Sequence, residues 1–561
     1  MNIYSYIKQE ISKICGISAD FSKDFSIETP KFENQGDVST NLALVLSKKI
    51  GKSPVEIANE FLPKIASLPF VLKSEVAGAG FINIYLKQEF LYEAFTGATE
   101  ESYGMSLEFG KGEKINVEYC SANPTGPIHI GHTRGTIYGD VISELLSKNG
   151  FKVTREFYIN DAGGQIETLL KSVLIRIKQL NGEQIEIPEG CYPGEYLIET
   201  AKKVIEKFGK EGFSESEVQT FVMQEMMQNI KTDLAKLKVK HDVFTSEAEI
   251  IKSGEVEKGI DILTKKGLLY RGILPQPKGK LTDEWEPREQ LLFKATDFGD
   301  TEDRALKKSD GKNTYFTSDM AYHKNKLDRG FLKMILVLGA DHLGYVKRIT
   351  AVTKALSQNP ENTSLDVKAC QIVKFLENGE PVRMSKRKGT FTTLSDVLDE
   401  VSPDILRFIL LTKKNDSQME FDIEKVKEQS KENPIFYIQY AFSRGSSIVR
   451  NANVDTTSIT LETLKMLATK EEMELIKKVL EYPKVIETAI RKFEPHLIAN
   501  YLYELVSQFH SLWNIGNEHS ELRFITENAE VTKVRIFLVK SVLNVVKSAL
   551  AIFKITPIEK M

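Results

Sequence analysis

Two histidines stand close to a glycine in residues 121–132, which read Ser-Ala-Asn-Pro-Thr-Gly-Pro-Ile-His-Ile-Gly-His. Imidazoles can donate hydrogen bonds to phosphate oxygens, and a glycine between them leaves bare backbone against which a flat base could lie. A zinc-binding helix would require a different spacing, with a glutamate base between the histidines. The run therefore indicates a nucleotide-binding turn built around His129, Gly131 and His132.

A strand before this turn and a helix after it would position the two histidines. Residues 115–120 alternate apolar and polar side chains, and apolar residues recur at helical spacing over 137–146. In a turn between a strand and a helix, unpaired backbone N–H groups and the positive end of the helix dipole attract phosphate. We therefore expect the turn to lie at the carboxyl end of a strand.

A basic run much later in the chain, residues 383–390, reads Arg-Met-Ser-Lys-Arg-Lys-Gly-Thr and could neutralise the charge of a triphosphate. Together, the two runs resemble the HIGH and KMSKS motifs of class I aminoacyl-tRNA synthetases, in the form found in arginyl-tRNA synthetases. Arg383 stands where the general pattern has lysine. The resemblance implies that His129, His132 and Lys386 are catalytic. It also implies an ATP site formed by Pro124, Gly126, Ile130, Gly131, Asp341, His342, Met384, Ser385, Arg387 and Lys388.

Recognition of arginine would require carboxylates, because a guanidinium needs planar, paired acceptors in a partly desolvated pocket. The 78 acidic residues do not identify the pocket by themselves. Residues 315–323 and 243–247 resemble segments that hold the guanidinium in arginyl enzymes, although Ser318 replaces a common arginine. The resemblance implies that arginine is bound by Asn123, Glu247, Tyr315 and Asp319.

Three domains are expected along the chain. Residues 1–105 form a small α/β domain that resembles the additional tRNA-binding domain of arginyl enzymes. Residues 106–430 alternate strands, at 153–159, 334–338 and around 371–375, with helices such as 166–177, and residues 275–313 suggest a surface insertion. Residues 431–561 are helical throughout and resemble an anticodon-binding bundle. We expect an α/β multidomain protein with a Rossmann-type parallel sheet, whose ligands bind at the carboxyl ends of the strands.

The helical segment supplies the candidate tRNA contacts. Unstacked anticodon bases are recognised by aromatic stacking and by hydrogen bonds to their edges. An aromatic residue at helical spacing is more often part of a core, so this interpretation depends on the resemblance. The implied contacts are Tyr437, Gln439, Tyr440, Trp513 and Met561.

Composition excludes several other classes of protein. The chain has 561 residues, of which 41% are hydrophobic and 27% charged, and a net charge of −3. It lacks the roughly 20-residue apolar stretch of a membrane helix and the layout of a signal peptide, so a cytoplasmic protein without membrane contact is expected. Its four scattered cysteines suggest neither disulfides nor a zinc site.

The resemblance implies that the chain is an arginine–tRNA ligase. ATP would activate L-arginine to arginyl-adenylate with release of pyrophosphate, and the arginine would then pass to the 3'-terminal ribose of tRNA(Arg). It further implies Mg²⁺ bound with ATP, no protein metal site, a monomer, and activation that requires bound tRNA. The alternatives are another class I synthetase, a nucleotidyltransferase acting on a small molecule, and a non-catalytic tRNA-binding paralogue.

Overall fold

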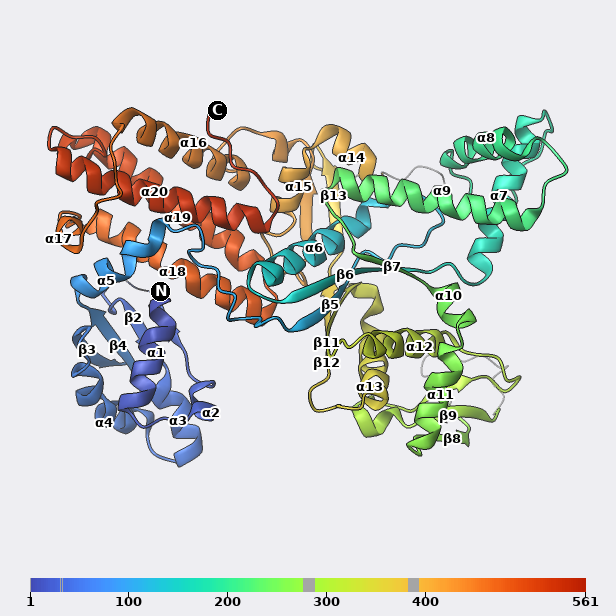
Figure 1. Cartoon of the computed structure of the whole chain (residues 1–561), viewed down its shortest axis with the longest axis horizontal. Helices are drawn as coiled ribbons and strands as arrows, with labels where there is room; N and C mark the ends of the chain where they lie inside the picture. The colour runs from blue at the N-terminus through green and yellow to red at the C-terminus, as the bar shows by residue number, and fades with distance from the viewer. Residues whose placement is uncertain (1, 31, 33, 276–287, 382–392) are drawn as a thin grey trace. The chain divides into compact units, whose positions relative to one another are not determined.

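The structure is a computed structural model that describes residues 2–30, 32, 34–275, 288–381 and 393–561 (Figure 1). It contains two compact units, one of residues 107–428 and one that combines residues 1–106 with residues 429–561. The basic run 383–390 lies outside the described residues. The three-domain division at 105 and 430 stays a prediction, because the first and last predicted domains share one compact unit.

A five-stranded parallel sheet, ordered β12-β11-β5-β6-β7, organises the unit 107–428. Its strands are β5 (Lys114–Glu118), β6 (Lys152–Ile159), β7 (Val243–Ser246), β11 (Lys333–Gly339) and β12 (Ser364–Cys370). The chain enters at β5, adds β6 and β7 on one side, and then places β11 and β12 on the other. Ligands of such sheets bind at the carboxyl ends of the strands where the order reverses, here between β5 and β11. The predicted doubly wound parallel sheet is confirmed.

Helix α6 (Thr133–Lys148) connects β5 to β6. It directly follows residues 121–132, which are called the histidine turn below. Its apolar positions are fully buried: Ile137, Val141, Ile142, Leu145 and Leu146. This stripe holds the start of α6 at the carboxyl end of β5. The strands predicted at 153–159 and 334–338 are found as β6 and β11, and the helix predicted at 166–177 lies within α7 (Gly164–Leu180).

Between β6 and β7, three helices pack around their own apolar cluster: α7, α8 (Tyr196–Phe208) and α9 (Glu215–Lys236). Further helices cover the remaining crossovers: α10 (Glu247–Lys252), α11 (Glu255–Lys265), α12 (Tyr315–Asp328), α13 (Val346–Leu356), α14 (Leu394–Glu400) and α15 (Pro403–Ile409). Thr393 and Asp396 form a capping box at the start of α14, and Pro403 is the first residue of α15. Both are favoured starts for helices.

Residues 275–313, predicted to be a surface insertion, contain regular structure in their described part. This part contributes β9 (Gln290–Phe293) and β10 (Arg304–Lys307), which join β8 (Leu269–Gly272) in an antiparallel sheet. Phe293 and Leu306 are fully buried in a core that includes residues of α12 and α13. The strands are short and lie among turn residues, so the composition of the segment concealed them.

The strand predicted around 371–375 is divided between two sheets. β12 ends at Cys370, and β13 (Val373–Glu377) begins a separate sheet with β14 (Glu380–Pro381) and β15 (Met419–Asp422). Gln371 and Ile372 connect the two, and the backbone N–H of Gln371 donates to Asn415 O at 2.8 Å. An apolar run shows neither such a break nor which sheet each half joins.

The other unit begins with a four-stranded antiparallel sheet, ordered β1-β2-β4-β3. Its strands are β1 (Ile27–Glu28), β2 (Val38–Thr40), β3 (Val71–Ala77) and β4 (Phe81–Leu86). The accompanying helices are α1 (Ile3–Ile14), α2 (Ala19–Ser22), α3 (Leu42–Ile50), α4 (Pro54–Ala66) and α5 (Gln88–Phe95). This is the small α/β region that the sequence predicts.

The rest of this unit is helical, as predicted. Its helices are α16 (Pro434–Ala452), α17 (Leu461–Leu464), α18 (Lys470–Lys492), α19 (His496–Glu518) and α20 (Ala529–Ile552). α18 packs along α19, and α16 packs along α20. α18 begins at a capping box of Thr469 and Glu472, so its start could be read from local sequence.

Candidate active site

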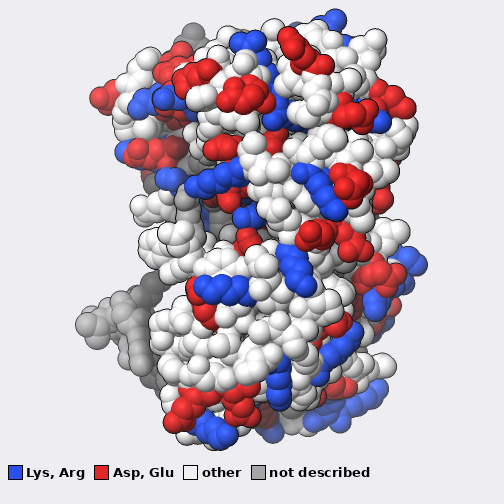
Figure 2. Space-filling model, turned by 90° about the vertical axis from the view of Figure 1, so that its left-hand side faces the viewer, with Lys and Arg blue, Asp and Glu red and all other residues white. Residues whose placement is uncertain are grey.

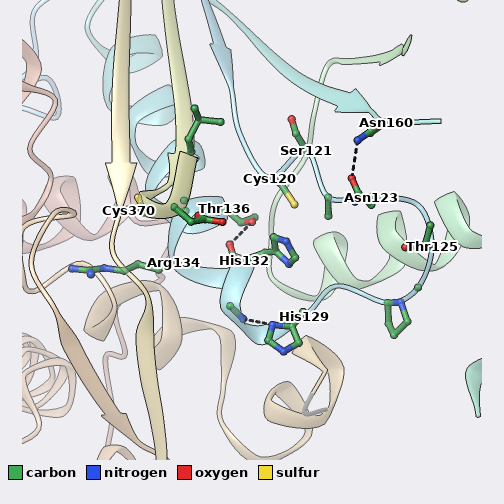
Figure 3. Close-up of a pocket in the computed structure, with 18 of the residues that line it drawn as sticks. Cys120, Ser121, Asn123, Thr125, His129, His132, Arg134, Thr136, Asn160 and Cys370 are labelled. Atoms are coloured by element: carbon green, nitrogen blue, oxygen red, sulfur yellow. Dashed lines mark hydrogen bonds between the residues drawn. The ribbon is translucent and has the colours of Figure 1, made fainter. Parts of the chain in front are cut away.

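A cavity of about 740 Å³ opens at the carboxyl ends of the central strands (Figure 3). This volume is typical of small-ligand sites, which span roughly 300–1,000 Å³. The histidine turn forms one wall, and the others come from residues at or after the ends of β6, β11 and β12 and from residues 192–196 at the start of α8. The lining residues include Asn123, Gly126, His129, Gly131, His132, Asn160, Asp341, His342 and Gln371. The structure therefore brings together side chains that are separated by more than 200 positions in the sequence.

The turn begins with two consecutive non-glycine residues in left-handed conformation, Cys120 (φ 71°) and Ser121 (φ 42°). Such backbone is strained, and surrounding interactions must hold it in place. The Ser121 hydroxyl donates to Glu118 Oε1 at 3.2 Å and accepts from the backbone N–H of Tyr158 at 3.1 Å. The ends of β5 and β6 thus fix the direction in which the turn leaves the sheet.

The His129 side chain caps the short 3₁₀ turn Ile130–His132. Its Nδ1 accepts the backbone N–H of Gly131 at 3.0 Å, so the neutral ring carries its proton on Nε2. A Cβ at position 131 would lie 2.9 Å from this Nδ1, which explains the glycine by the cap itself. The resulting Nε2–H is a donor suited to an anionic oxygen.

His132 stands at the start of α6, where its carbonyl accepts from Thr136 Oγ1 at 2.8 Å (Figure 3). The rings of His129 and His132 lie 6.2 Å apart and nearly perpendicular, at 86°. Both border the cavity. Two imidazoles and a helix N-terminus are therefore directed at one small volume, an arrangement that favours phosphate.

Two contacts hold the loop before the histidines. Asn160 Nδ2 donates to Asn123 Oδ1 at 3.1 Å, and the Tyr196 hydroxyl donates to Thr125 O at 2.6 Å. A Cβ at Gly126 would lie 2.9 Å from the same hydroxyl. Position 126 therefore has no room for a side chain unless Tyr196 moves.

Next to this loop, four carboxylates form an acidic cluster around the Tyr158 side chain: Glu118, Asp161, Glu247 and Asp319. Burial raises the pKa of Tyr158, and all four charges raise it further. Burial also raises the pKa of Asp319 to about 7, with Glu247 and Glu118 adding to the shift. Burial likewise raises the pKa of Glu247, with Asp161 adding. Acidic side chains crowded in this way favour a cation.

Elements of the central sheet anchor two members of the acidic cluster. Glu118 is ion-paired with the buried Lys326 at 2.5 Å. Asp161 accepts from Ser246 Oγ at 2.7 Å and from the backbone N–H of Ala248 at 2.9 Å, which ties the end of β6 to the start of α10. Glu118 and Asp161 were not among the predicted site residues. Their signal was their place at the ends of the strands that precede and follow the histidine turn.

The remaining predicted site residues occupy different environments. Tyr315, the first residue of α12, is one turn before Asp319 and 84% exposed. Pro124 and Ile130 are buried and are not among the residues that line the cavity. Asp341 and His342 are exposed, and Asp341 Oδ2 lies 3.4 Å from His342 Nε2. The other predicted ATP-site residues and the predicted catalytic lysine, which are Met384, Ser385, Lys386, Arg387 and Lys388, lie outside the described residues.

In the helical unit, predicted tRNA contacts gather around one arginine of α16. The Arg444 guanidinium lies over the rings of Tyr440 and Trp513, at 4.6 and 5.2 Å, and donates to Nδ1 of His510 at 2.8 Å. Tyr437 packs against His510 with the ring centres 4.5 Å apart. Tyr440 is 40% exposed. Partly exposed aromatic rings beside a guanidinium provide a surface on which unpaired bases can stack.

Gln439 and Met561 belong to a contact between α16 and the C-terminal residues. Gln439 is buried; its Nε2 donates to Thr556 O at 3.2 Å, and its Oε1 accepts from the Ile558 N–H at 2.7 Å. The Met561 N–H donates to Ser443 Oγ at 3.0 Å, while its side chain is 57% exposed.

On the face shown in Figure 2, basic and acidic side chains are interspersed.

Two kinds of feature are absent from the described residues. No helix in this part of the chain has the length and apolar character required to cross a membrane. Nor does it contain three or more His, Cys, Asp or Glu side chains grouped to hold a metal ion.

Known protein families match the chain along almost its whole length. The family described as arginyl tRNA synthetase N terminal domain matches residues 1–86. The family of class I (R) tRNA synthetase catalytic domains matches residues 99–440, and the DALR anticodon binding domain matches residues 438–561. The order of these families is the order of the predicted domains.

Individual relatives agree with the family matches. The arginine–tRNA ligase of Rickettsia akari is 44% identical over the full length of both chains, and that of a Wolbachia from Brugia malayi is 46% identical over the full length of both. The solved arginyl-tRNA synthetase of Thermus thermophilus has the same fold, with a TM-score of 0.77 at 19% identity, covering 100% of this chain and 99% of that one. The chain therefore belongs to the arginyl-tRNA synthetase family of class I aminoacyl-tRNA synthetases.

Proposed function

We propose that the histidine turn and the acidic cluster together form the centre at which this chain charges tRNA with arginine. The reaction of the family is arginine activation by ATP followed by transfer of arginine to tRNA. The observation that carries the proposal is the convergence of a phosphate-binding turn and a cation-binding cluster at the carboxyl ends of β5 and β6. A small-molecule nucleotidyltransferase has no need for the helical unit with its exposed aromatic rings.

In the first step, the carboxylate of arginine attacks the α-phosphorus of ATP, and pyrophosphate leaves. The Nε2–H of His129 and the ring of His132 donate hydrogen bonds to the phosphate oxygens as negative charge develops on them. The N-terminus of α6 adds its dipole to the same region. Lys386, with Arg387 or Lys388, neutralises the leaving pyrophosphate; this assignment rests on the family resemblance alone.

Arginine selectivity comes from the acidic cluster. Asp319 and Glu247 accept hydrogen bonds from the guanidinium, while Asn123, held by Asn160, orients the other end of the amino acid. A bound guanidinium stabilises the ionised form of Asp319, so binding releases the proton that a pKa of about 7 retains on part of the molecules. The Tyr315 ring closes over the ligand from the first turn of α12.

In the second step, the 2'-hydroxyl of the terminal tRNA ribose attacks the adenylate and AMP leaves. The exposed aromatic rings near Arg444 stack on anticodon bases, and Met561 contributes from the C-terminal residues. Activation depends on bound tRNA, as the family resemblance implies. We further propose that the protein is cytoplasmic and monomeric.

Mg²⁺ accompanies ATP in this proposal. The described wall of the cavity carries one carboxylate, Asp341, and it is paired with His342. This composition fits an ion held mainly by phosphate oxygens and water, as is usual for Mg²⁺ with nucleotides. When bound with ATP, the ion would supply positive charge that neutralises the phosphates.

The decisive experiment is ATP–pyrophosphate exchange with each amino acid, with and without cognate tRNA. Exchange with arginine alone, and only when tRNA is present, would support both the pocket and its coupling to tRNA. Exchange with another amino acid would contradict the acidic cluster as an arginine site but keep the class I reaction. Absence of exchange under all conditions would favour a non-catalytic tRNA-binding protein.

A further inference from the structure

Arg134, the second residue of α6, is a buried cation with an unusual set of partners. It is 1% exposed, and its guanidinium donates five hydrogen bonds to backbone carbonyls. Nε bonds Leu410 O at 3.3 Å, Nη1 bonds Gln371 O at 3.4 Å and Ser417 O at 2.6 Å, and Nη2 bonds Lys413 O at 3.3 Å and Lys414 O at 2.8 Å. Five donors are all that an arginine side chain has.

This position is unfavourable for a positive charge by ordinary helix rules. The first turn of a helix is the positive end of its dipole, so a cation there is repelled, and burial adds a desolvation cost. Local rules are most often broken at functional sites. The five backbone carbonyls that accept from Arg134, called the carbonyl cage below, compensate for the desolvation of its charge. They also belong to the segments that Arg134 holds together.

Arg134 connects the histidine turn to two distant segments. One is Gln371, the link between β12 and β13; the other is the loop 410–417 between α15 and β15. In Figure 3 the guanidinium points away from His132, so that the turn has His132 on one side and the cage on the other. The histidine turn also contacts the start of α14. Ile128 O accepts a hydrogen bond from the backbone N–H of Leu394 at 2.9 Å, and His129 forms an isolated antiparallel β-bridge with Thr393.

We propose that Arg134 is a positioning residue for arginine activation, which fixes the orientation of His132 by locking the first turn of α6 to Gln371 and the loop 410–417. This assignment rests on the proposed function of the histidine turn. Because reacting groups lose efficiency steeply with small displacements, the cage matters for the rate of the chemical step more than for binding of arginine.

Arg134→Lys keeps the charge but cannot reach the planar set of five carbonyls. We expect kcat of arginine-dependent ATP–pyrophosphate exchange to fall about 10- to 100-fold, as misplacement of a catalytic group does. The KM for arginine should stay within about 2-fold, because the acidic cluster belongs to other elements. A matched control is Arg407→Lys: Arg407 is fully buried, bonds Leu237 O at 3.0 Å, and pairs at 2.5 Å with Asp140 Oδ2 in the middle of α6, so it anchors the same helix away from the histidine turn.

A double-mutant cycle with His132→Asn separates positioning from general support. If Arg134 acts through His132, Arg134→Lys should lower kcat less than about 3-fold in a protein that already carries His132→Asn. The assignment would be overturned if Arg134→Lys lowered kcat by the same factor with and without His132→Asn. It would also be overturned if Arg407→Lys, with the same loss of Tm, lowered kcat as much as Arg134→Lys does. If Arg134→Lys does not fold, Arg134→Gln replaces it in the same cycle. Failure of the proposed function is distinguishable, because the wild-type protein would then show no arginine-dependent exchange.

Discussion

Glu247 and Asp319 reach the same acidic cluster from different helices, α10 and α12, and the charge of Glu247 adds to the burial that raises the pKa of Asp319 to about 7. Below about pH 7 this raised pKa favours the protonated form of Asp319, and a bound guanidinium would favour the ionised form. Arginine binding and proton release are linked through this one carboxyl.

The first prediction concerns the pH dependence of arginine binding. At pH 6, one unit below its pKa, roughly nine-tenths of Asp319 is protonated and must ionise before it can accept a guanidinium. The apparent Kd for arginine should therefore be about 10-fold weaker at pH 6 than at pH 8, and constant above pH 8. Calorimetry in buffers of different ionisation enthalpy would measure both the Kd and the protons released. Equal Kd values at pH 6 and pH 8 would contradict the linkage.

A second prediction separates stability from activity at the same residue. When the pKa of a carboxyl is higher in the folded than in the unfolded protein, the free energy of unfolding falls as pH rises from about 4 to about 7. The reason is that the carboxyl of the unfolded chain releases its proton at lower pH. Asp319→Asn removes this loss, so its Tm at pH 8 should exceed that of the wild type by about 2 °C or more. Arginine-dependent exchange should be abolished. A Tm gain at pH 4 as large as at pH 8 would show that charge is not the cause.

A third prediction divides the two nitrogens of His129. An asparagine side chain can place its Oδ1 near Nδ1 and keep the cap on the Gly131 N–H, but it has no group at the position of Nε2. His129→Asn should therefore keep a near-native Tm and lose about 10²–10³-fold in kcat, the usual cost of removing one donor to a developing negative charge. His129→Gln provides the reverse control, since it loses the cap. If His129→Asn retains normal kcat, the Nε2 proton has no role in the reaction.

A fourth prediction follows from the lack of space at Gly126. The Cβ of Gly126→Ala would lie 2.9 Å from the Tyr196 hydroxyl and displace the loop that carries Asn123. We expect a rise of about 10-fold or more in the KM for arginine or ATP, from misplacement of binding groups. Tyr196→Ala in the same chain should recover part of this loss, whereas Tyr196→Phe, which keeps the ring, should not. Steady-state exchange kinetics of the four proteins test the contact.

A fifth prediction concerns Gln439, for which the structure shows two hydrogen bonds to the C-terminal residues. Gln439→Ala removes both bonds, so residues 556–561 should exchange amide hydrogen faster. The KM for tRNA in aminoacylation should rise about 3-fold or more, while the KM for ATP stays unchanged. In a chain that ends at Ile555, the same substitution should have no further effect. A direct base contact by Gln439 would instead give the same loss in both backgrounds.

Motifs and periodicity predicted the parts that depend on neighbouring residues. The strand before residue 121, the buried stripe of α6 and the helices after 431 are all encoded over short stretches, while the class of reaction was implied by the family resemblance. The two short strands after 288 and the break at Gln371 were missed, because such elements depend on partners elsewhere in the chain and have little local signal.

By itself, the sequence determined the position of the histidine turn, since residue types and spacing carry that information, and its resemblance to arginyl-tRNA synthetases implied the reaction class. Only the tertiary structure decided that Glu118 and Asp161 join Glu247 and Asp319 around one tyrosine, and that burial beside other carboxylates raises the pKa of Asp319. The same holds for the five carbonyls around Arg134. These features depend on distances between strand ends and on burial, which parallel pairing creates between segments far apart in the chain.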